Sequence, residues 1–105
     1  MSAEKIIIEA EKIGFVPGMT PGKFIALCYK AVYGIKLPET LPQLMNIGIK
    51  VTKTNLKVGD LVFPTQNNVG IYLGNGTMVH VLNTSKLPKI SFINNLYTAR
   101  RVINN

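Results

Sequence analysis

The spacing of apolar residues changes at Lys57, and this change restricts the folds that the chain can adopt. Before Lys57, apolar residues recur every three or four positions, as they do on one face of an α-helix. After it, short apolar runs alternate with turn residues, which is typical of consecutive β-strands. Helices followed by strands predict an α+β domain, with N-terminal helices packed on a C-terminal antiparallel β-meander. A chain of 105 residues has the length of a single domain, 1–105.

Residues that begin and end helices frame two long helices in the first third of the chain. Ser2 is expected to cap the first helix, and Gly14 to end it. Thr20 is expected to cap the second helix, and Pro21 suits its first position because the missing N–H would be unpaired there anyway. Gly34 ends the second helix, whose wide apolar face predicts that it lies at the centre of the core.

The remaining elements are predicted from short apolar runs and from turns. A short helix is expected within residues 39–45. The expected strands are 61–63, ended by Pro64, then 69–73, 78–82, 90–93 and 97–102. Residues 74–76, Gly-Asn-Gly, predict a tight hairpin turn between the second and third of these strands.

Positive charge is the main feature of the composition, with 12 lysine and arginine residues against five acids and a net charge of +7. Such a charge favours acidic partners, and a basic module that binds nucleic acid or an anionic wall polymer is one hypothesis. The lysines are scattered along the chain, however, and only Arg100 and Arg101 are adjacent. Because nucleic-acid-binding modules concentrate their charge and interleave aromatic residues, nucleic acid is not the expected partner.

Cysteine and histidine are too few for a disulfide or a structural metal site. Cys28 is the only cysteine, and one cysteine with one histidine cannot supply the ligands of a structural zinc site. We therefore expect no metal and no cofactor. The sequence also shows no signal peptide and no apolar run near the roughly 20 residues of a membrane span. A cytoplasmic or particle-associated protein without a membrane partner is therefore expected.

Two stretches of the second half together resemble a known family. Residues 57–63 read Lys-Val-Gly-Asp-Leu-Val-Phe, and residues 68–80 read Asn-Val-Gly-Ile-Tyr-Leu-Gly-Asn-Gly-Thr-Met-Val-His. They are similar to the NlpC-type cell-wall cysteine peptidases, and the similarity extends over about 5–102. These are compact papain-like enzymes that cut the peptide stems of bacterial peptidoglycan. The resemblance implies a papain-like NlpC-type domain.

The resemblance also places the family's catalytic positions on this chain. The family's nucleophile lies in an Asp-Cys-Ser-Gly motif at the start of the central helix, which corresponds to residues 20–23, so Pro21 stands at the nucleophile. Asn68 stands at the general-base histidine, and His80, 12 residues further on, stands at the polar residue that orients the base. Proline has no nucleophilic group, and asparagine cannot take up a proton near pH 7. The resemblance therefore implies a degenerate member that lacks the catalytic Cys and His.

The first functional hypothesis is a catalytically inactive domain that acts by binding or as a structural part. Its partner is expected to be a peptidoglycan-type peptide of the bacterial cell wall, or another protein in an assembly such as a phage tail or tail-like particle. The binding residues expected under this hypothesis are Thr20, Asn68 and His80. The abundance of Asn, Ile and Lys indicates a low-GC bacterium or its phage as the source.

The alternative is an active peptidoglycan-cleaving cysteine peptidase that uses Cys28 with His80. Cys28 lies seven residues, about two helical turns, after Pro21. Its place on the apolar face of the helix predicts a buried thiol, and burial raises the pKa of a thiol. The alternative requires the side chains of Cys28 and His80 to lie within hydrogen-bond reach of each other.

Overall fold

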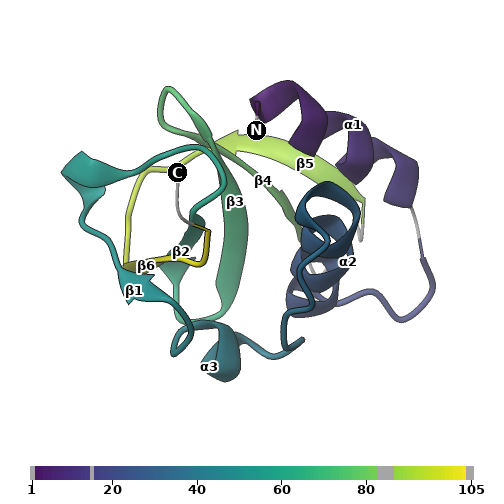
Figure 1. Ribbon diagram of the computed structural model, residues 1–105, viewed down its shortest axis with the longest axis horizontal. Helices are drawn as coiled ribbons and strands as arrows, with labels where there is room; N and C mark the ends of the chain where they lie inside the picture. The colour runs from purple at the N-terminus through teal and green to yellow at the C-terminus, as the bar shows by residue number, and fades with distance from the viewer. Residues whose placement is uncertain (1, 15, 83–86, 104–105) are drawn as a thin grey trace.

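The computed structural model, which describes residues 2–14, 16–82 and 87–103, shows three α-helices beside a six-stranded antiparallel sheet (Figure 1). The helices are α1 (Ala3–Ile13), α2 (Pro21–Tyr33) and α3 (Leu41–Leu44), and a short 3-10 helix, η1, spans Lys53–Asn55. The strands are β1 (Ile49–Lys50), β2 (Leu61–Thr65), β3 (Asn68–Gly74), β4 (Thr77–Val81), β5 (Pro88–Phe92) and β6 (Thr98–Arg101). The predicted α+β class is confirmed. None of the described helices is long and apolar enough to cross a membrane.

Both long helices begin at the capping residues expected from the sequence. The Ser2 hydroxyl accepts a hydrogen bond from the N–H of Lys5 at 3.4 Å, and the Thr20 hydroxyl accepts one from the N–H of Lys23 at 3.2 Å. Each bond satisfies a backbone donor that has no partner within its own helix. Gly34 ends α2 in the left-handed conformation, with a φ of +70°. These local signals mark the start of both helices and the end of α2.

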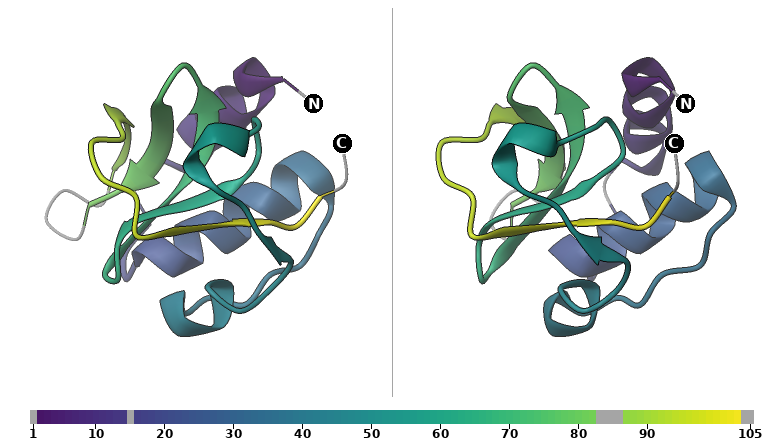
Figure 2. Two further views of the ribbon diagram at one scale, coloured as in Figure 1. Left: turned by 90° about the vertical axis from the view of Figure 1, so that its left-hand side faces the viewer. Right: turned by 60° about the vertical axis from the view of Figure 1, so that its left-hand side comes forward.

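The strand order is β1-β6-β2-β3-β4-β5, so the meander itself covers β2 to β5. Between β3 and β4 the chain turns at Asn75 and Gly76, whose φ angles of +53° and +73° fit the predicted tight turn. β6 returns past the meander and pairs with β2 instead of β5. Its other neighbour is the two-residue edge strand β1. The yellow segment that leads into β6 can be followed in both views of Figure 2.

The prediction that Pro64 ends its strand is wrong. β2 continues through Pro64 to Thr65. Its pairing with β3 shifts register between Val62 and Thr65, and an irregularity of this kind lets a residue without an N–H group stay within a strand. The longer strand leaves only Gln66 and Asn67 for the turn into β3.

The two faces of the sheet bury different groups of side chains. One face, which includes Val79 and Val81 of β4, packs on α1 and α2 in the larger core. The opposite face packs in a smaller cluster that includes Val51 and Met78. Because side chains alternate along a strand, His80 shares this second face with Met78. Figure 1 shows α1 and α2 together on one side of the sheet.

Candidate functional site

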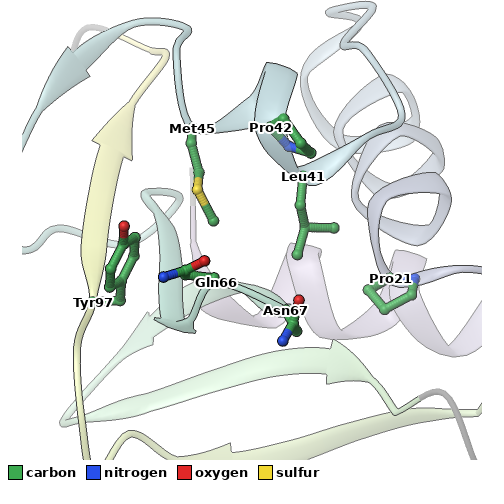
Figure 3. Close-up of a pocket in the computed structure, with 7 residues that line it drawn as sticks. All are labelled: Pro21, Leu41, Pro42, Met45, Gln66, Asn67 and Tyr97. Carbon is green, nitrogen blue, oxygen red and sulfur yellow. The ribbon is translucent and has the colours of Figure 1, made fainter.

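A groove of about 540 Å³ opens where the start of α2, the α3 segment and the β2–β3 turn meet (Figure 3). It is lined by Pro21, Leu41, Pro42, Met45, Gln66, Asn67 and Tyr97. In Figure 3, the side chains of Leu41 and Met45 point from the α3 segment toward the β2–β3 turn. Tyr97 stands beside Gln66, on the chain that enters β6. The groove is therefore apolar on the α3 side and carries amide groups on the sheet side.

Close backbone contacts hold the two walls of the groove in place. A Cβ atom at Gly22 would lie 2.0 Å from the carbonyl oxygen of Glu39. Only glycine therefore lets the start of α2 come this close to the segment that leads into α3. On the opposite wall, the N–H of Tyr97 donates a hydrogen bond to the carbonyl oxygen of Phe63 at 2.8 Å. The start of α2 thus lies close against the segment before α3, and a backbone hydrogen bond holds Tyr97 to β2.

The groove offers groups that bind by hydrogen bonding and packing. Gln66 and Asn67 contribute amides, Tyr97 a phenol, and the other lining residues apolar surface. The lining residues include no acid, no histidine and no lysine or arginine. Within the described ranges, no group of three His, Cys, Asp or Glu side chains could hold a metal ion.

Of the site residues predicted from the sequence, Pro21 lines the groove. Thr20 lies next to it, but its hydroxyl accepts the backbone hydrogen bond that caps α2. Asn68 begins β3 and is half-buried, and its neighbour Asn67 takes the place in the groove wall. Contact of a ligand with Thr20, Asn68 or His80 stays a prediction.

His80 is buried on β4, where it is 3% exposed. Its Nε2 lies 2.9 Å from the hydroxyl of Ser91, and its Nδ1 has no hydrogen-bond partner among the described residues. Burial lowers the pKa of His80, and the positive charge of Lys89 lowers it further, so the ring is neutral at pH 7. His80 pairs with Gly70, and Asn68 lies two residues before Gly70 on the same strand face. The structure thus brings Asn68 and His80 to one face of the sheet.

Cys28 lies in the helix-side core instead. It is fully buried, and its thiol donates to the carbonyl oxygen of Ile6 in α1, with an S···O distance of 3.9 Å. Burial raises the pKa of Cys28 to about 12, and the negative charge of Glu9 acts in the same direction. Val79 of β4 faces this core, whereas His80, the next residue, faces away from it. The thiol and the imidazole therefore belong to opposite sides of the sheet.

We expect the native protein to resist thiol reagents at pH 8. With a pKa of about 12, only about 1 in 10⁴ of the Cys28 thiols is ionised at that pH, and burial also blocks access. Alkylation by iodoacetamide, followed by mass spectrometry, is expected to be slow in buffer and fast in denaturing urea. A native rate within about tenfold of the rate in urea would contradict the buried position.

Most of the groove carries no clear signal in the sequence. Leu41 and Pro42 belong to a short helix whose sequence does not indicate a binding site. Gln66 lies in a polar turn, and such residues are common in turns of any function. Tyr97 is predicted as the start of the strand 97–102, whereas β6 begins at Thr98 and 56% of the Tyr97 surface is exposed. Tyr97 immediately precedes β6, so its place in the groove wall depends on the long-range pairing of β6 with β2.

The fold and the groove define a papain-like α+β domain that is open at the start of its central helix. The chain belongs to the NlpC/P60 family, whose family model matches residues 18–105. It is similar to the probable endopeptidase NlpC homolog of Haemophilus influenzae, with 37% identity over 84 residues that cover 79% of this chain and 45% of that protein. The chain thus spans about half the length of this curated relative.

Solved structures share the fold. An NlpC/P60 family protein from Bacillus cereus gives a TM-score of 0.82 at 22% identity, over 99% of this chain and 41% of that chain. RipD from Mycobacterium tuberculosis gives a TM-score of 0.75 at 22% identity, over 96% of this chain and 97% of that chain. RipD is described as a non-catalytic NlpC/p60 domain protein with an adaptation to peptidoglycan binding.

Proposed function

We propose that this chain is a non-catalytic NlpC/P60 domain that binds a peptidoglycan-type peptide in the groove beside α3. The observation that carries the proposal is Pro21, which lines the groove at the start of α2, where the family's nucleophilic thiol is expected. Asn68 occupies the position expected for the general base. With neither a thiol nor an imidazole at these positions, the groove can hold a ligand but lacks the groups that attack it.

The side chains of the groove support a peptide as the ligand. Gln66 and Asn67 are exposed, and each amide offers two donors and an acceptor, which match the amide groups of a peptide. Tyr97 and Met45 offer an exposed ring and a flexible apolar chain against which peptide side chains pack. The description of RipD as a peptidoglycan-binding relative in fold agrees with this proposal.

The alternative of a cysteine peptidase has less support. Cys28 is buried in the helix-side core, its pKa is raised to about 12, and His80 bonds to Ser91 on the other face of the sheet.

A protein in a phage tail or similar particle is the other partner that the groove could receive. An extended segment of such a protein would meet the same side chains.

Binding of soluble murein stem peptides, measured by calorimetry, tests the proposal together with a search for cleavage products by mass spectrometry. We expect saturable binding and no cleavage between pH 5 and pH 9. Tyr97→Ala is expected to weaken binding about tenfold, because the ring is a large exposed part of the groove wall. Phe92→Ala is the matched control: Phe92 is 75% exposed on β5 and does not line the groove, so the affinity should not change.

Three outcomes would overturn the proposal. Cleavage that disappears in Cys28→Ser would establish an enzyme instead. Equal affinity in Tyr97→Ala and Phe92→Ala would place the ligand outside the groove. Binding to a purified particle protein, without binding to stem peptides, would replace the peptide with a protein partner.

A further inference from the structure

The groove continues beyond Met45 into a second hollow of about 560 Å³. The two hollows share Pro42, Met45 and Tyr97, all of which are labelled in Figure 3. The second hollow adds Asn46, Lys50 and Thr98 to its walls. A ligand in the first hollow can therefore extend along Tyr97 from the Pro21 end toward Lys50 at the edge of the sheet.

The far end of this extended groove carries positive charge without a matching acid. Lys50 on β1 pairs with Arg100 on β6, and antiparallel pairing places the two cationic side chains next to each other. Like charges in such a pair repel, and the Nε of Arg100 is buried without a hydrogen-bond partner among the described residues. The five acids lie elsewhere: Glu4, Glu9 and Glu11 in α1, Asp60 bound to Arg101, and Glu39 outside the lining of both hollows.

We propose that Lys50, with the charge of Arg100 beside it, holds a carboxylate of the peptide whose remaining residues lie in the groove toward Pro21. This inference rests on the proposed function and specifies the ligand as an extended peptide with a free carboxylate at the β1–β6 end. A carboxylate placed in the hollow would relieve the repulsion between the two cations and accept a charge-assisted hydrogen bond from Lys50. The observation that favours an anionic group here is Lys50, which lines the second hollow with no acid among the lining residues and has Arg100 as its cross-strand neighbour.

The rest of the groove favours a peptide over a polyanion. A polymer of phosphates needs cations spaced along its whole length. Here Lys50 is the only cation among the residues that line the two hollows. The other walls are apolar or carry the amides of Gln66, Asn67 and Asn46. This arrangement fits one terminal charge followed by a neutral, amide-rich chain.

A matched pair of ligands tests the proposal: a soluble murein stem peptide with free carboxylates and the same peptide fully amidated. Calorimetry on the whole chain at low salt is expected to show binding about five- to tenfold tighter for the free acid. Higher salt should reduce the difference in affinity between the free acid and the amide, because salt screens exposed charges. Lys50→Gln and Arg100→Gln should each reduce the preference toward equality. Lys53→Gln is the matched control, since Lys53 is exposed on η1, lines neither hollow and is not a strand partner of Lys50.

The outcomes separate this inference from the proposed function. Equal binding of the acid and the amide, or a preference that survives both Lys50→Gln and Arg100→Gln, overturns the carboxylate site and leaves peptide binding intact. No binding of either peptide overturns both proposals. A short oligonucleotide or a wall-polymer fragment that displaces the peptide and binds more tightly would also overturn the assignment to a peptide carboxylate.

Discussion

Gly22→Ala is expected to lower the free energy of unfolding by about 3 kcal/mol. This is the upper end of the usual cost of overpacking, because the added methyl group would meet rigid backbone. The new Cβ would lie 2.0 Å from the carbonyl oxygen of Glu39 and 2.7 Å from its carbonyl carbon. Relief requires α2 and the segment before α3 to move apart. For a domain of this size, the melting temperature should fall by about 12–24 °C in a thermal unfolding measurement.

The matched control for this prediction is Gly18→Ala. Gly18 has a φ of +77°, but an added Cβ would meet no atom within 4 Å. Its substitution should cost only the left-handed backbone strain, about 1 kcal/mol. The movement in Gly22→Ala should also weaken peptide binding, because Pro21 and Leu41 lie on the two segments that separate. Equal destabilisation by both substitutions would show that the contact with Glu39 is not the cause.

The second large effect is expected from Asp60→Asn, which should destabilise the protein by about 2–3 kcal/mol. The Asp60 side chain is 1% exposed, and its carboxylate accepts bonds of 2.8 Å from the N–H of Lys57 and from both Nε and Nη2 of Arg101. Arg101 also donates to the carbonyl oxygen of Asn55 at 2.7 Å. Removing one partner of a buried ion pair leaves the other charge uncompensated. We expect a smaller loss of stability than for a fully buried pair, because Arg101 is partly exposed.

A double-mutant cycle separates the energy of the Asp60–Arg101 pair from that of the hydrogen bond between Asp60 and the N–H of Lys57. Urea unfolding of Asp60→Asn, Arg101→Gln and the double variant should give a double-variant loss clearly smaller than the sum of the single losses. Arg101→Lys keeps the charge but loses the two-pronged geometry, so it should restore only part of the stability. Strict additivity of the two single variants would contradict the coupling.

Local signals in the sequence predicted the elements well where neighbouring residues make the decisive contact. Thr20 caps α2 through a residue three positions away, and Asn75 turns the hairpin by its own backbone conformation. The same local reasoning failed at Pro64, because the register shift between β2 and β3 that accommodates it depends on a second strand. It also did not place β6 beside β2, because that pairing joins residues far apart in the chain.

The sequence by itself determined the α+β layers, the ends of the long helices, the hairpin and the resemblance to the NlpC-type family, from which we predicted that Pro21 and Asn68 stand at the catalytic positions. These features depend on hydrogen bonds and periodicities within short stretches of chain. Only the tertiary structure decided that Pro21 lies in a groove with Met45, Gln66 and Tyr97. The groove depends on the approach of Gly22 to the backbone of Glu39 and on the return of β6 to β2, and such long-range contacts are not encoded in local spacing.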